Sequence, residues 1–244
     1  MRKTMGVLLA SVLVLGGARF VRPGEEADGR AIVNKAIKAA GGADKLAKHK
    51  SVTFKGKGIY YGMGKGLPYT GTYAVQWPDK FRMEIKGFYM MVLDGDKGWT
   101  KKEKETKEMT KEEVAQEQSN QKAGWITTLL PLADKAFQVK AIGATKVDKQ
   151  DALGVKVTRK DYPDVTLYFD KQSGLLVKSS FRFQSAAEKS KEVTQDNYYK
   201  EHREIDGVQL PSKMVIKRDD KLFVEEEISD YKAGKLDAKI FGRP

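Results

Sequence analysis

The alternation of apolar and polar residues is clearest over residues 77–86. Phe81, Met83 and Ile85 alternate there with charged residues, and a period of two predicts a β-strand with one apolar and one solvated face. The next stretch, residues 88–93, is apolar on both faces, so it needs apolar partners on both sides. Together these strands predict a sheet that curls around a helix, a core or a ligand.

Strand-like stretches continue along most of the chain, separated by turns rich in Asp and Gly. The expected strands cover residues 52–61, 69–77, 81–86, 88–94, 98–104, 137–147, 154–160, 164–170, 175–184, 192–203, 208–218 and 222–231. Strands and helices do not alternate, so a parallel sheet is not expected. The pattern predicts a mainly β (α+β) protein with an up-and-down curled sheet of about eleven or twelve strands.

One helix is expected before the first strand, over residues 31–40, because its apolar residues fall on one stripe. A second helix is expected to interrupt the strands. Thr110 and Glu113 have the spacing of a capping box at its start, and Pro131 ends it.

The second helix changes character along its length. It is polar through Gln121 and apolar after Gly124, which is the pattern of a helix lying over the edge or mouth of a sheet. It is therefore a candidate lid with Gly124 as a hinge. An ordinary helix packed on the sheet by its last turns is the alternative. The apolar lid residues are Trp125, Ile126, Leu129 and Leu130.

The first 18 residues have the three parts of a secretory signal peptide. Arg2 and Lys3 precede an apolar run, and Gly16, Gly17 and Ala18 provide a small-residue cleavage site. Residues 19–30 are expected to form a flexible leader, and residues 31–244 a single domain. These features predict an exported, periplasmic protein. The chain has no cysteine, so a lipid anchor on an N-terminal cysteine is not expected.

The chain is basic, with 45 Lys and Arg against 33 Asp and Glu and a net charge of +12. Loss of the signal peptide leaves 43 basic residues and a net charge of +10. This charge suits an anionic surface such as lipid head groups. The alternative is a surface whose scattered lysines only keep the protein in solution.

Catalytic, metal and nucleic-acid sites have little support in the sequence. His49 and His202 have no second ligand at a suitable spacing, so no metal, cofactor or enzymatic activity is expected. A hydrolase remains open only through a carboxylate pair, with candidates Asp164, Asp170, Glu225, Glu226 and Glu227. Phe181 and Phe183 fall on one strand face, which favours an interior position over nucleic-acid binding.

Large adaptable apolar residues are numerous, among them Met63, Met83, Met90, Met91, Met109 and Met214. Methionine fills irregular space and tolerates varied ligands, and a curled, unclosed sheet can keep an apolar hollow that suits acyl chains. The residues expected to line it are Trp77, Phe81, Met83, Ile85, Met90, Val92, Trp99 and Phe181.

A series of short motifs resembles the periplasmic lipoprotein carriers and receptors of the LolA and LolB type and their outer-membrane lipoprotein-sorting relatives. The motifs are Ala39-Ala40-Gly41-Gly42, residues 77–84 (WPDKFRME), Asp94-Gly95 with Gly98-Trp99, residues 166–175 and residues 206–211. The resemblance covers roughly residues 31–244 and rests on the order and spacing of these motifs.

The resemblance implies an incomplete antiparallel β-barrel whose open mouth is covered by helices, with a hydrophobic cavity for acyl chains. It implies that residues 110–132 form the lid and that Arg82 holds it through hydrogen bonds to helix backbone. The implied partners are lipid or lipoprotein cargo and envelope membrane proteins, with the chain as a monomer. Two departures from the family are the Met83 that follows Arg82 and the absence of the receptor's anchoring cysteine. An envelope sensor domain with a filled core, which binds an anionic glycan or a partner protein, is the alternative function.

Overall fold

The computed structural model of the chain describes residues 23–186 and 191–244. Its helical elements are α1 (Pro23–Ala39), α2 (Ala43–Ala47), η1 (Lys48–Lys50), α3 (Lys111–Thr127), η2 (Leu130–Ala133) and η4 (Ala238–Phe241). Its strands are β1 (Ser51–Tyr60), β2 (Leu67–Gln76), β3 (Lys80–Ile85), β4 (Tyr89–Asp94), β5 (Lys97–Lys102), β6 (Glu105–Glu108), β7 (Gln138–Val147), β8 (Gln150–Thr158), β9 (Val165–Asp170), β10 (Leu176–Ser185), β11 (Lys191–Ile205), β12 (Val208–Arg218) and β13 (Lys221–Ala233).

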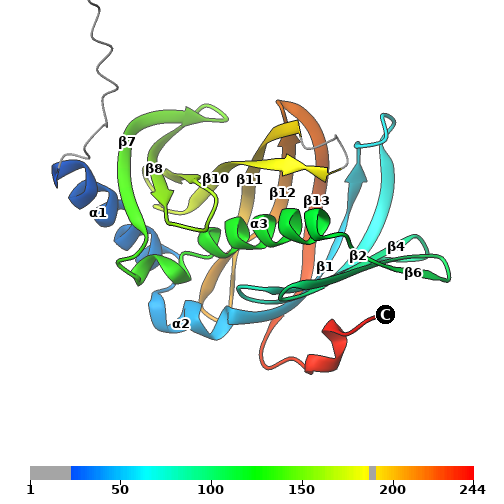
Figure 1. Cartoon of the computed structure of the whole chain (residues 1–244). Coiled ribbons are helices and arrows are strands. Elements are labelled where there is room, and N and C mark those ends of the chain that lie inside the picture. Colours follow the sequence, from blue (N-terminus) through cyan, green and yellow to red (C-terminus); the bar gives the residue numbers. More distant parts are fainter. Residues whose placement is uncertain (1–22, 187–190) are drawn as a thin grey trace, which may run out of the picture.

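All 13 strands form one antiparallel sheet in the order β6-β5-β4-β3-β2-β1-β13-β12-β11-β10-β9-β8-β7. Neighbouring strands follow each other in sequence except at β1 and β13, which pair with each other in the middle of the sheet. The sheet is therefore a strongly curved, incomplete barrel with β6 and β7 as its two edges, as the sequence and the family resemblance predict (Figure 1).

Helix α3 connects the two edge strands and lies inside the curve of the sheet (Figure 1). Its main contacts with strands are to β4 on one side and to β9 and β10 on the other. We call the sheet face toward α3 the inner face and the opposite face the outer face. Because side chains alternate along a strand and paired residues share a face, the strand register assigns each residue to one of them.

The largest core cluster lies between α3, α1 and strands β7 to β11. Ile126 of α3, Phe137 just before β7, and Val139 and Leu167 of the sheet are completely buried in it. Helix α1 packs along β7, where the Arg30 guanidinium donates hydrogen bonds to the carbonyl oxygens of Leu132 and Phe137. The edge strand β7 is thus covered, which protects its unpaired backbone groups from other chains.

Two elements, α1 and β6, differ most from those expected from the sequence. Helix α1 begins at Pro23 rather than at residue 31, so residues 23–30 are not a flexible leader; proline favours the first turn of a helix. The sheet also contains β6, which the sequence pattern misses because Glu105–Glu108 has no apolar alternation and becomes a strand by pairing with β5. The expected signal peptide, residues 1–18, lies outside the described residues.

Candidate functional site

Four of the eight predicted cavity residues lie on the inner face of the sheet. Phe81, Met83 and Ile85 of β3 pair with Leu93, Met91 and Tyr89 of β4, and this cluster packs against Val114 of α3. Phe181, on the other flank, belongs to the main core with Ile126.

Three of the predicted cavity residues lie on the outer face, and that part of the prediction is wrong. Val92 pairs with Arg82 and Trp99, and Met90 with Glu84. All three pack beneath the C-terminal turn around Phe241 rather than beneath α3. The run from Tyr89 to Leu93 is apolar on both faces because each face has its own cover: α3 inside and the C-terminal turn outside. Phe88, in the turn before β4, is 62% exposed.

The eighth residue, Trp77, lies at the start of the β2–β3 turn and contacts α3 directly. Its ring stacks on Trp125 with 6.2 Å between ring centroids. Gly124 allows this approach, because a Cβ atom at that position would lie 2.8 Å from the Trp77 ring. In the structure α3 runs without a break through Gly124, so this glycine serves close packing.

Three of the four predicted lid residues divide between two core clusters, and the fourth contacts Trp77. Ile126 and Leu129 are buried in the main core, and Leu130 packs with Leu46 and Val208 in a smaller one. Trp125 is half-buried and reaches Trp77. The apolar end of α3 and the residues directly after it therefore fix the helix to the sheet.

Arg82 does not hold α3, which corrects the role that the resemblance implies. Its guanidinium lies on the outer face, where Nη1 donates to the Ile240 carbonyl oxygen at 3.2 Å and Nη2 to Glu84 Oε2 at 3.0 Å. Arg82 does bind helix backbone, but the backbone belongs to η4.

Hydrogen bonds from polar side chains fix the first part of α3. Gln118 Nε2 donates to the Gly95 carbonyl oxygen at 2.9 Å, and the Ala186 amide donates to Gln116 Oε1 at 2.6 Å. The predicted capping box is confirmed: the Glu113 amide donates to Thr110 Oγ1, and the Thr110 amide donates to Glu113 Oε2. The polar half of α3 thus crosses the inner face, held by a hydrogen bond to Gly95 on one side and to Ala186 on the other.

The centre of the inner face, between those flanks, carries large side chains that are only half-buried. The strand register places them on β1, β2, β12 and β13; they include Phe54, Tyr69, Tyr73, Met214, Ile216 and Val224. Phe54 and Tyr73 stack with 4.6 Å between ring centroids. This apolar surface lies outside the main contacts of α3.

One buried acid interrupts this apolar surface. Glu226, in the middle of β13, is only 4% exposed, and its Oε1 accepts hydrogen bonds from the hydroxyls of Tyr73 at 2.6 Å and Tyr69 at 3.0 Å. Burial raises the pKa of the Glu226 carboxyl, and the two phenolic hydrogen bonds only partly oppose that rise. Burial together with the neighbouring carboxylate also raises the pKa of both tyrosines.

Sequence analysis names Glu226 only as a candidate for a hydrolase carboxylate pair and misses its cluster with Tyr69 and Tyr73, because Glu226 sits in a run of three acids that resembles a solvated strand face. The missed signal is on β1, where Gly56 and Gly58 alternate with lysines. Glycine weakens a strand unless another group needs the space. Here a Cβ on Gly56 would lie 1.8 Å from Glu226 Oε1.

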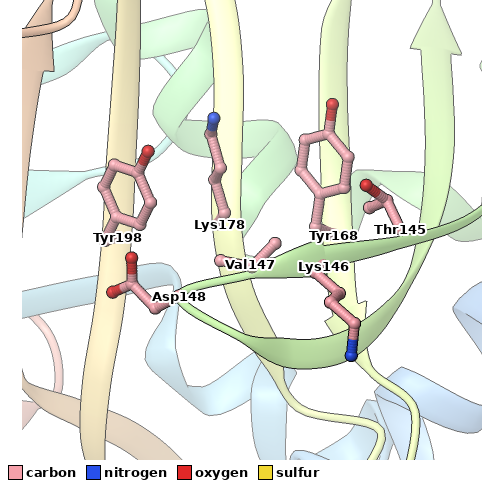
Figure 2. Close-up of a pocket in the computed structure, with 7 residues that line it drawn as sticks. All are labelled: Thr145, Lys146, Val147, Asp148, Tyr168, Lys178 and Tyr198. Atoms are coloured by element: carbon pink, nitrogen blue, oxygen red, sulfur yellow. The ribbon is translucent and has the colours of Figure 1, made fainter.

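A polar cavity of about 170 Å³ lies on the outer face, under the β7–β8 hairpin. Figure 2 shows Lys178 between the rings of Tyr168 and Tyr198, which lie 5.6 and 5.1 Å from its Nζ. Each of three lysines at or beside this cavity forms a salt bridge with an aspartate: Lys178 with Asp196, Lys146 with Asp151 and Lys200 with Asp148. These pairs compensate the positive charge that an anionic glycan would need.

Two further features, a metal site and a membrane-spanning helix, find no support in the part of the chain that is described. Residues 23–186 and 191–244 contain no group of three or more His, Cys, Asp or Glu arranged to hold a metal ion. Within the same residues, no helix combines the length and the apolar character needed to cross a membrane.

Comparisons with known proteins find similarity at the level of three-dimensional structure. A LolA superfamily protein from Nitrosomonas europaea matches with a TM-score of 0.56 and 12% identity, over 88% of this chain and 97% of that one. A DUF1329 family protein from Desulfovibrio piger matches with a TM-score of 0.56 and 13% identity over the same shares. A putative outer membrane lipoprotein-sorting protein domain from Vibrio parahaemolyticus matches with a TM-score of 0.51 and 12% identity, over 86% and 97% of the two chains.

No protein-family model and no curated protein matches the sequence. The three structural matches each cover 97% of the other chain, so the likeness extends over the whole fold. The chain therefore has the LolA-like fold, the incomplete β-barrel found in LolA superfamily and lipoprotein-sorting domain structures.

Proposed function

We propose that this chain is an exported carrier without enzymatic activity, which binds the acyl chain of a lipid or lipoprotein on the inner face beneath α3. It would carry that cargo through the periplasm as a monomer, with envelope membrane proteins as loading and receiving partners. The signal-peptide pattern of residues 1–18 supports export, and the LolA-like fold supports the type of cargo.

The observation that carries the proposal is the half-buried apolar centre of the inner face. Phe54, Met214 and Ile216 lie there between the two flanks that α3 contacts. Transfer of apolar surface out of water contributes about 0.8 kcal/mol per methylene, so an acyl chain of roughly 16 carbons gains on the order of 10 kcal/mol before opposing terms. Such a chain needs an apolar but adaptable surface, and methionine side chains provide one.

Two adjacent residues of β12 provide a matched test. Ile216 faces inward, opposite Asn197 and Val224, whereas Val215 faces outward, opposite Tyr198 and Glu225. Both are β-branched and half-buried. Ile216→Gln places an amide against the acyl chain, which costs about 1–3 kcal/mol, whereas Val215→Gln leaves the inner face unchanged.

The measurement is a titration of both variants and the unchanged protein with a neutral pyrene-labelled acyl ester. We expect Ile216→Gln to weaken binding about tenfold or more and Val215→Gln to change it less than about twofold. Circular dichroism and thermal unfolding check that both variants fold. Equal effects of the two substitutions, or no binding by the unchanged protein, would overturn the proposal.

A further inference from the structure

The Glu226 carboxyl has one engaged oxygen and one unengaged oxygen. Both tyrosine hydroxyls converge on Oε1, at 2.6 and 3.0 Å. Among the described residues, Oε2 has no hydrogen-bond partner. It is also not one of the fully buried atoms without a partner, which are His49 Nδ1, Asn120 Oδ1 and Asp196 Oδ1. Oε2 is thus the oxygen that a ligand on the inner face can reach.

The surrounding sequence makes room for this carboxyl. A Cβ on Gly56 would lie 1.8 Å from Glu226 Oε1, and a Cβ on Gly71 would lie 3.2 Å from the Tyr73 hydroxyl. Both glycines belong to strands of the inner face, Gly56 pairing with Gly71. The glycines of β1 and β2 therefore leave space for the side chains of Glu226 and Tyr73, and the cluster extends over the neighbouring strands β13, β1 and β2.

The charges around Glu226 are sorted between the two faces of the sheet. The lysines of the adjacent strands, Lys55, Lys57, Lys213 and Lys217, alternate with inner-face residues and lie on the outer face. Arg218 reaches the inner face, where its guanidinium lies 3.7 Å from the Phe223 ring centroid and its Nε donates to Gln195 Oε1 at 3.0 Å. Glu226 itself has no ion-pair partner among the described residues. A protein with a net charge of +12 thus holds an uncompensated acid on its inner face.

We propose that Glu226, Tyr69 and Tyr73 form a polar subsite that selects amphiphiles with an N–H donor, an amine or an amide, next to the acyl chain. This inference rests on the proposed function, since the subsite lies within the same apolar surface. A buried carboxyl without a cation gains most from a charged or strongly polar N–H donor. A ligand carboxylate or phosphate at the same place would meet like charge. The cross-strand partner of Glu226 is Met214, which places apolar contact for the chain beside the polar group.

The test compares four ligands with the same 12-carbon chain, by displacement of the neutral pyrene-labelled ester: dodecylamine, dodecanamide, methyl dodecanoate and dodecanoate. We expect the amine and the amide to bind about fivefold or more tighter than the methyl ester, in line with a hydrogen bond from the ligand N–H to the buried carboxyl. Dodecanoate should bind more weakly than the ester.

Glu226→Gln should abolish the advantage of the amine over the ester, because the new amide offers N–H groups of its own, while binding of the ester stays within about twofold. Glu227→Gln is the matched control: Glu227 is the next residue and lies on the outer face, opposite Lys57 and Lys213, so the preference should survive. Tyr73→Phe tests the subsite independently and should reduce the preference.

The outcomes separate the two proposals. If the ester binds, and the amine, the amide and dodecanoate all bind as tightly as the ester, the subsite is wrong and the carrier proposal stands. If the ester itself does not bind, the carrier proposal fails. An amine preference that persists in both Glu226→Gln and Tyr73→Phe would also overturn the subsite.

Discussion

At the scale of single residues, Glu226 makes the stability of the sheet depend on pH. Because burial raises its pKa above the unfolded value, near 4.3, the folded state holds this proton more tightly than the unfolded state. The contribution of the residue to the free energy of unfolding is therefore greatest below about pH 4 and falls as the pH rises toward the folded pKa, by up to about 1.4 kcal/mol per pH unit.

Urea unfolding of the unchanged protein and of Glu226→Gln at about pH 4, 5, 6 and 7 isolates this effect, since the variant lacks the titrating group. We expect the stability of the unchanged protein, relative to the variant, to decrease with increasing pH. A difference that is constant or that grows with pH would contradict the buried environment of Glu226.

The face of the sheet on which a side chain lies was predictable where apolar and polar residues alternate, and unpredictable where they do not. Phe81, Met83 and Ile85 alternate with charged residues, which placed them correctly on one face. Met90 and Val92 lie in an uninterrupted apolar run, so nothing local separates them from Met91 and Leu93. Only the C-terminal turn, about 150 residues further along, decides which face they cover.

At the scale of elements, local chemistry predicted the start of α3, and distant contacts decide what holds it. The Thr110–Glu113 capping box is a signal within four residues of sequence. The backbone partner of Arg82, in contrast, is Ile240, and no local pattern connects these two positions. The edge strand β6 is a similar case, because it exists through its pairing with β5.

Two substitutions should loosen different elements. Arg82→Ala removes the hydrogen bond to the Ile240 carbonyl, so we expect amide hydrogen exchange in residues 236–241 to accelerate about tenfold while α3 is unaffected. Thr110→Ala removes the cap of α3 at a cost of about 1 kcal/mol and should accelerate exchange in the first turn of that helix alone. Faster exchange throughout α3 in Arg82→Ala would restore the lid-holding role to Arg82.

At the scale of the whole molecule, α3 joins the two edges of one open sheet, so the helix that covers the inner face is also the link that spans the opening. The succession of strands in a curled sheet followed from turn spacing and from the absence of a strand–helix alternation, and the open barrel followed from the family resemblance. The pairing of β1 with β13, which brings Glu226 beside Gly58, joins residues far apart in the chain. The candidate subsite could not be found without it.

The most direct test of the carrier account maps where an acyl chain lies. The protein is illuminated with a neutral acyl ester that carries a photoreactive diazirine in its chain, and the labelled residues are identified by mass spectrometry. We expect labels on inner-face residues such as Phe54, Met83, Met214 and Ile216, and their loss when unlabelled ester competes. Labels confined to outer-face residues such as Val215, or labelling that competitor does not reduce, would contradict the account.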